Sequence, residues 1–224
     1  MNDRTSKYLK KLFVGFLFLL LSVPVNPILS QETAEMETID KKVEKFLKAH
    51  RGNWYDMNVP ESDGRVLYDL IIKNNYQKAL EIGTSTGHSG IWIAWALSKT
   101  GGKLITIEID QGRHKTALAN FREAGLSQYI DARLADAHDL VEELQGPFDF
   151  IFSDADKDWY TNYFIALAPK LRVGGCFTAH NVSWKYDRNI KAFLNYVKSL
   201  PNFETTISTA SSEGVSISYK RAEK

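Results

Sequence analysis

The stretch Ala79-Leu-Glu-Ile-Gly-Thr-Ser-Thr-Gly-His-Ser-Gly90 predicts a buried strand, a glycine-rich turn and the start of a helix. The apolar run 79–82 is followed at once by Gly83, Gly87 and Gly90, and apolar residues then recur at helical spacing. Glycines at such a turn let backbone N–H groups approach a ligand closely, and the positive end of the following helix points to the same place. The spacing is E-x-G-x-x-x-G, not the G-x-G-x-x-G of dinucleotide-binding folds, so this stretch alone indicates either a ligand loop or a tight strand–helix connection.

The composition is that of one ordinary globular domain, with 224 residues and 44% hydrophobic residues. The net charge of +1 gives no global electrostatic footprint for nucleic acid, so we expect no nucleic-acid partner. The single cysteine, Cys176, excludes an intrachain disulfide and a cysteine-based metal site.

Residues 1–30 are predicted to be a signal sequence or membrane anchor, and residues 31–224 the folded domain. Basic residues precede the apolar run 12–23, and the small residue Ser30 follows before a polar segment. The run is shorter than the ~20 apolar residues of a transmembrane helix. The positive flank predicts that the domain is exported, as a periplasmic or secreted protein, or held at a membrane through residues 12–23. A cytoplasmic location stays open.

Strands and helices alternate along the rest of the chain. We expect strands at 79–82, 103–108, 130–135, 148–153, 174–179, 203–209 and 215–220, and helices at 36–50, 111–124, 140–144, 160–171 and 187–200, with a further helix capped by Ser62 or Asp63. This alternation predicts an α/β fold with a mostly parallel sheet and helices on both faces. The last two strands are expected to meet as a hairpin.

Polar side chains stand where the predicted parallel strands end: Glu108, Asp136, Asp154, His180 and Asn181. In open α/β sheets, ligands bind outside the carboxyl ends of the strands. We therefore expect these five side chains and the glycine turn to converge on one site.

With these residues, the chain resembles the class I S-adenosylmethionine-dependent O-methyltransferases, in particular the small metal-dependent group that includes catechol and caffeoyl-CoA O-methyltransferases. The resemblance covers roughly residues 58–219 and rests on the segments 80–89, 106–110, 148–160, 174–182 and 213–220. It implies a Rossmann-like seven-stranded sheet whose last strand is antiparallel.

The resemblance also implies how S-adenosylmethionine would be held. The glycine turn and Ser89 would receive the cofactor's carboxylate, Glu108 both ribose hydroxyls, and Asp136 the adenine amino group. The complete implied set is Val59, Glu81, Gly83, Ser85, Ser89, Glu108, Asp136 and Ala137.

Methyl transfer to a phenolic hydroxyl, whose pKa is ~10, requires a deprotonated oxygen. A divalent cation lowers that pKa, and a nearby base removes the proton. By the resemblance, Asp154, His180 and Asn181 bind the metal, and Lys157 is the general base beside Asp154. The resemblance also implies that Asp156 contacts the acceptor, a small catechol-like molecule. Trp184 follows the segment 174–182, and we expect its ring to stack on an aromatic acceptor.

One position departs from the family pattern, which has a second aspartate in place of His180. An Asp/His/Asn set has one negative charge fewer and a softer ligand, which favours Mn²⁺, Fe²⁺ or Zn²⁺ over Mg²⁺ or Ca²⁺. Two alternatives stay open: a metal-free O-methyltransferase with His180 as the base, and a cofactor-binding domain without catalysis. The helix at 36–50 would offer a surface for a homodimer.

Overall fold

The computed structural model describes residues 27–183 and 187–223, with side chains from residue 36 onward apart from residue 37. In this part of the chain, seven strands form one sheet in the order β3-β2-β1-β4-β5-β7-β6. The strands are β1 (Lys78–Ile82), β2 (Lys103–Glu108), β3 (Ile130–Leu134), β4 (Phe148–Ser153), β5 (Leu171–His180), β6 (Phe203–Ser208) and β7 (Val215–Lys220).

The first five strands pair in parallel, and β7 runs antiparallel to both of its neighbours, β5 and β6. The prediction of an α/β fold with an antiparallel last strand is therefore confirmed. Strand order reverses between β1 and β4, because the chain goes outward from β1 to β2 and β3 and then returns to β4 on the other side of β1. This reversal is the point at which such sheets bind ligands.

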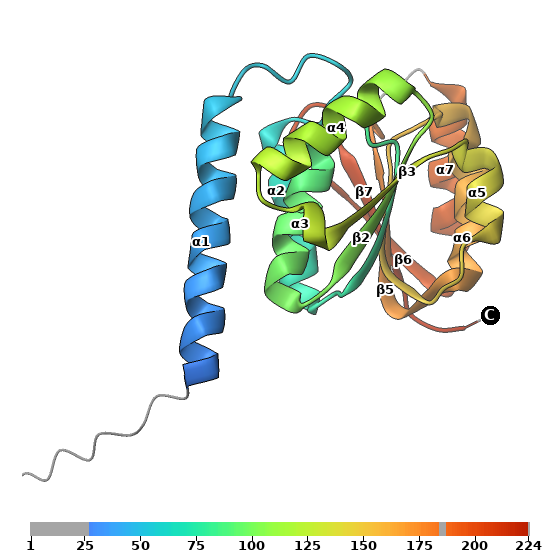
Figure 1. Ribbon diagram of the computed structural model, residues 1–224. Helices are drawn as coiled ribbons and strands as arrows, with labels where there is room; N and C mark the ends of the chain where they lie inside the picture. The colour runs from blue at the N-terminus through green and yellow to red at the C-terminus, as the bar shows by residue number, and fades with distance from the viewer. Residues whose placement is uncertain (1–26, 184–186, 224) are drawn as a thin grey trace, which may run out of the picture.

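Helices cover both faces of the sheet (Figure 1). They are α1 (Pro27–Ala49), α2 (Glu61–Asn74), α3 (His88–Thr100), α4 (Gln111–Glu123), α5 (Ala137–Glu143), α6 (Tyr160–Leu167) and α7 (Arg188–Ser199). One face carries α2, α3 and α4, with α1 outside them, and the other carries α5, α6 and α7 (Figure 1).

Alternation of side chains along the strands divides the core between the two faces. In β1, Leu80 packs in the cluster that contains Phe164 of α6 and Phe193 of α7. Its neighbour Ala79 packs in the cluster that contains Leu67 of α2. Each of these side chains is at most 1% exposed, and a fully buried leucine or phenylalanine contributes about 1.5–3 kcal/mol. The same alternation fixes the strand register and hence the position of the strand ends.

Helix α1 packs against the outside of α3 through Ile39, Val43 and Phe46. It is longer than the predicted helix at 36–50, so the predicted boundary after Ser30 falls in its first turn. Among residues 27–183 and 187–223, no helix combines the length and apolar character needed to cross a bilayer. The apolar run 12–23 lies outside the described residues.

The start of α2 differs from the prediction, because neither Ser62 nor Asp63 caps it. The residue before the helix is Pro60, in an extended conformation, and its carbonyl accepts hydrogen bonds from the backbone N–H groups of Asp63 and Gly64 at 3.1 and 3.0 Å. Proline suits a helix entry because its φ is fixed and it has no N–H to satisfy. The Asp63 side chain is thus released from capping and is fully buried.

The chain between α6 and β5 also differs from the prediction. Helix α6 ends at Leu167, where a short 3-10 turn with Pro169 follows, and β5 already begins at Leu171. Helix α6 is therefore shorter than the predicted helix at 160–171, because Pro169 cannot continue it, and β5 is longer than the predicted strand at 174–179.

Candidate active site

A cavity of about 790 Å³ lies at the carboxyl ends of β1, β2, β4 and β5. Ten of the residues singled out in the sequence border it: Gly83, Ser85, Glu108, Asp136, Ala137, Asp154, Asp156, Lys157, His180 and Asn181. The expected convergence of the strand ends on the glycine turn is therefore confirmed. Trp184 lies outside the described residues.

The glycine turn connects β1 to α3 as predicted. Gly83 has φ +94°, and a Cβ atom there would lie 2.8 Å from the backbone oxygen of Asp154. Only glycine permits this approach. The end of β1 therefore touches the end of β4 directly, and this contact joins the cofactor half of the proposed site to the acceptor half.

Glu108 presents its carboxylate to the cavity from the end of β2. Its Oε2 accepts from the backbone N–H of Ser85 at 2.7 Å, and its Oε1 accepts from that of Asp110 at 2.9 Å. These two hydrogen bonds from backbone N–H groups fix the orientation of the Glu108 carboxylate. A carboxylate held this way is suited to accept hydrogen bonds from two adjacent hydroxyls.

The next part of the cavity wall is the start of α5. Asp136 caps this helix, accepting from the backbone N–H of His138 at 2.9 Å. The His138 ring stacks on Trp159 at 3.8 Å between centroids, and its Nε2 lies 3.5 Å from Asp156 Oδ2. His138 borders the cavity, and this position could not be predicted, because an isolated histidine near a helix start carries no signal of a binding site.

Three predicted cofactor residues, Val59, Glu81 and Ser89, lie behind the cavity wall and do not border it. Glu81 is fully buried below the glycine turn, where its Oε2 accepts from Thr106 Oγ1 at 2.6 Å. Burial raises the pKa of Glu81 to about 8, against hydrogen bonds from Ser89 and Thr106 that lower it. The roles predicted for these three residues stay predictions.

The loop before α2 borders the cavity through Met57, Asn58 and Pro60, and His88 at the start of α3 fixes this loop. The Nδ1 of His88 donates to the Val59 carbonyl at 2.8 Å, and its Nε2 accepts from Trp92 Nε1 at 3.1 Å. These two bonds require the neutral ring, and burial lowers the pKa of His88 accordingly. The ring also stacks on Trp54 at 4.3 Å. His88 is thus a structural residue of the loop.

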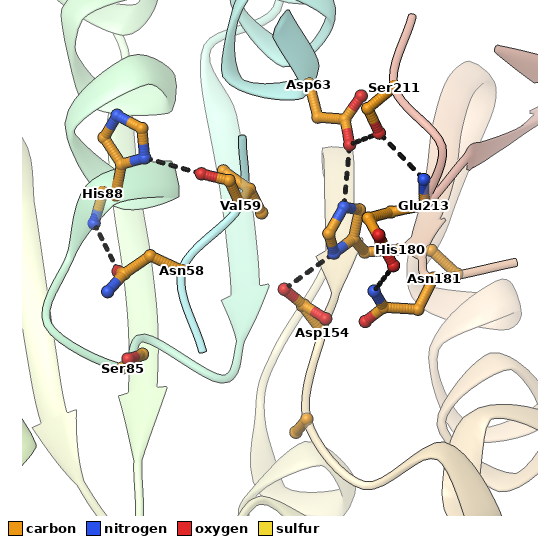
Figure 2. Close-up of polar contacts among 12 residues, drawn as sticks. Asn58, Val59, Asp63, Ser85, His88, Asp154, His180, Asn181, Ser211 and Glu213 are labelled. Carbon is orange, nitrogen blue, oxygen red and sulfur yellow. Dashed lines mark hydrogen bonds and ion pairs between the residues drawn. The ribbon is translucent and has the colours of Figure 1, made fainter. Parts of the chain in front are cut away.

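The ends of β4 and β5 carry a chain of charged side chains, shown in part in Figure 2. Lys157 Nζ lies 2.7 Å from Asp154 Oδ1, and Asp154 Oδ2 lies 3.2 Å from His180 Nδ1. The other ring nitrogen, His180 Nε2, lies 2.8 Å from Asp63 Oδ2. Asn181, with φ +58°, donates from its amide nitrogen to Glu213 Oε2 at 3.1 Å.

The two flanking carboxylates, Asp154 and Asp63, raise the pKa of His180. Burial by itself lowers the pKa of His180, but hydrogen bonds and charge attraction from Asp154 and Asp63 outweigh it and raise the pKa to about 9. The ring therefore holds a proton on each nitrogen at neutral pH. Any role as a metal ligand or a base requires the loss of the proton on Nδ1.

Comparison with known proteins agrees with this arrangement. The profile of the O-methyltransferase family matches residues 30–190. A catechol O-methyltransferase of Niastella koreensis is 41% identical over 130 residues, which is 56% of this chain and 58% of that protein. Caffeoyl-CoA O-methyltransferase 1 of Eucalyptus globulus is 35% identical over 136 residues, which is 58% of this chain and 55% of that protein.

Among solved structures, an O-methyltransferase from Bacillus cereus in complex with SAH superposes with a TM-score of 0.68 at 26% identity. The match covers 81% of this chain and 91% of that one. The strand order and the position of the cavity are those of a class I methyltransferase. The chain belongs to the O-methyltransferase family. The matches span a little over half the length of the two curated relatives.

Proposed function

We propose that this chain is an S-adenosylmethionine-dependent O-methyltransferase that methylates a hydroxyl of a small, catechol-like acceptor with the help of a divalent cation. The observation that carries the proposal is that the glycine turn after β1 and the charged cluster after β4 and β5 border one cavity. Support for the acceptor class comes from the relatives named for catechol and for caffeoyl-CoA.

The cavity has a volume of about 790 Å³ and is bordered by polar groups suited to the parts of the cofactor, which supports this proposal. Glu108 would hold the ribose hydroxyls, the turn from Gly83 to Ser85 the amino-acid end, and Asp136 with Ala137 the adenine. When bound, the cofactor supplies a methyl group attached to a positively charged sulfur. The chain's own part is to hold the acceptor oxygen in line with that methyl group, which by itself accounts for much of the acceleration in such reactions.

The donor set after β4 and β5 also fits a cation. Asp154 Oδ2 and His180 Nδ1 are 3.2 Å apart, a separation that suits two ligands of one ion at about 2.1 Å each. In the described part of the chain, no three histidine, cysteine, aspartate or glutamate side chains gather around one point. The third protein ligand would therefore be the amide oxygen of Asn181, whose amide nitrogen is engaged by Glu213.

When bound, the cation lowers the pKa of the acceptor hydroxyl as a Lewis acid. Lys157, in its neutral amine form, would receive the hydroxyl's proton at Nζ, and Asp154 Oδ1, 2.7 Å away, would stabilise the ammonium that results. Asp156, which borders the cavity beside Lys157, would position the acceptor, and Trp184 would stack on its ring.

The test is methyl transfer from radiolabelled S-adenosylmethionine to a panel of catechols, using the full chain stripped of metal. We expect activity to return with Mn²⁺, Fe²⁺ or Zn²⁺ more than with Mg²⁺ or Ca²⁺. Lys157→Met should lower kcat about 100- to 10,000-fold while SAH binding is unchanged. Lys191→Met, an exposed lysine of α7, is the matched control.

The outcomes separate the alternatives. Full turnover in excess EDTA would show that no cation is needed, and it would support the metal-free mechanism in which His180 is the base. Cofactor binding without transfer to any acceptor would leave a non-catalytic binding domain. Absence of cofactor binding would overturn the proposal.

We further propose that residues 1–30 direct the domain out of the cytoplasm or anchor it to a membrane. The support is the basic flank and apolar run of the sequence alone. Cell fractionation with protease accessibility on intact cells tests this, and a fully protected domain that is recovered only in the soluble fraction would contradict it. Light scattering of the purified chain tests the homodimer proposed through the helix at 36–50.

A further inference from the structure

Asp63 is a buried carboxylate that the proposed reaction leaves without a role. It lies in the first turn of α2, and its side chain is 0% exposed. Its Oδ2 accepts from Ser211 Oγ at 2.6 Å and lies 2.8 Å from His180 Nε2. Its Oδ1 has no hydrogen-bond partner among the described residues. Figure 2 shows the three side chains meeting from α2, β5 and the segment before β7.

A buried carboxylate such as Asp63 lowers the stability of the fold unless hydrogen bonds or nearby charges compensate for its burial. A buried carboxylate without adequate partners is destabilising by several kcal/mol, and an apolar side chain of similar size often packs as well. Position in the first turn of α2 reduces the cost, because the positive end of a helix stabilises a negative charge. Two hydrogen bonds on one oxygen reduce it further.

The contact with Asp63 determines which way the His180 ring faces. A carboxylate can only accept, so the hydrogen of this bond sits on Nε2. When the opposite nitrogen is deprotonated, its lone pair then points from Nδ1 toward Asp154 Oδ2, 3.2 Å away. A hydrogen bond to one imidazole nitrogen is the usual way in which proteins fix the tautomer and orientation of the other as a ligand.

We infer that Asp63 is a positioning residue that locks the His180 ring with Nδ1 toward Asp154 and Asn181. The inference rests on the proposed function, in which His180 takes the place of a carboxylate ligand. A histidine in that place is useful only if its ring cannot turn away, and Asp63 supplies that restraint from a different element.

A purely structural role for Asp63 makes a different prediction. If its purpose were to tie α2 to the segment before β7, the bond from Ser211 would matter as much as the bond to His180. Ser211→Ala removes the tie and keeps the contact with His180, whereas Asp63→Asn keeps the shape and removes the charge. The pair of variants therefore separates the two roles.

The experiment is calorimetric titration of the full chain with Mn²⁺ alone, together with long-range ¹H–¹⁵N NMR of the histidine rings in the metal-free chain. For Asp63→Asn we expect Mn²⁺ affinity about 10- to 100-fold weaker, SAH affinity unchanged, and altered ring-nitrogen shifts of His180. For Ser211→Ala we expect a loss of affinity below about threefold and unaltered shifts, since its contact is with Asp63 and not with the ring.

Equal Mn²⁺ affinity in wild type and Asp63→Asn would overturn the inference, as would a loss in Ser211→Ala as large as that in Asp63→Asn. If wild type binds no cation, the metal part of the proposed function fails, and the NMR arm decides on Asp63 alone. Unaltered His180 shifts in Asp63→Asn would then overturn the inference, and altered shifts would support it.

Discussion

Replacement of Glu81 by glutamine should remove a large pH dependence from the stability of the fold. Glu81 lies at the end of β1 with no exposed surface, and its pKa is raised to about 8, mainly by burial. In the unfolded chain the same carboxyl titrates near its ordinary value of 4.5. Between these two values the folded chain keeps the proton and the unfolded chain has lost it.

The sign follows from proton linkage. The folded state binds more protons in this window, so wild-type stability falls as pH rises from about 4.5 to about 8, and levels off above that. At about 1.4 kcal/mol for each pH unit, the difference between the two values corresponds to about 5 kcal/mol. Domains of this kind are stable by only about 5–15 kcal/mol, so the effect is large.

Urea unfolding, followed by tryptophan fluorescence at pH 5, 6, 7 and 8, measures how the free energy of unfolding depends on pH. We expect Glu81→Gln to match wild type near pH 5 and to exceed its free energy of unfolding increasingly up to pH 8. Asp131→Asn, at a carboxylate that is 52% exposed, removes the same charge and should leave the pH profile unchanged. Parallel pH profiles for wild type and Glu81→Gln would refute the reasoning.

Three further substitutions test the site. Gly83→Ala places a Cβ 2.8 Å from the Asp154 backbone at φ +94°, so it should lower the free energy of unfolding by at least about 2 kcal/mol, and unchanged urea unfolding would contradict the close approach. His88→Phe leaves the Trp92 N–H and a loop carbonyl unsatisfied, so we expect a loss of about 2 kcal/mol or more in the same assay, and a loss under about 0.5 kcal/mol would argue against those bonds. Glu108→Gln removes the charge without changing the shape, so SAH affinity measured by calorimetry should fall at least about tenfold, and an equal Kd would remove Glu108 from the cofactor site.

The periodicity of apolar residues and the polar residues at the ends of the predicted strands were sufficient to predict where most residues of the site lie. Parallel strands end at one edge of a sheet, so Glu108, Asp154 and His180 had to meet there once the alternation of strands and helices was recognised. The glycine turn was recognisable because a turn that lets two strand ends touch requires glycine, as Gly83 shows at φ +94°.

Contacts between elements that are distant in the chain could not be predicted from the sequence. Asp63 has the residue type of a helix cap and lies near the start of α2. Only the fold shows that Pro60 is the residue before the helix and that the Asp63 carboxylate contacts His180 instead. The E-x-G-x-x-x-G spacing likewise places Glu81 near the end of its strand, but it does not show whether the side chain borders the cavity. In the structure Glu81 is fully buried behind the cavity wall.

The meeting of Asp63, His180 and Ser211 sets an order of events during protein synthesis. Asp63 leaves the ribosome 117 residues before His180 and 148 residues before Ser211. Because a chain is synthesised from its N-terminus, Asp63 cannot form its contacts with His180 and Ser211 until most of the chain has been made. A nascent or truncated chain that stops before β5 would carry the glycine turn and yet lack His180 and Asn181 of the proposed metal site.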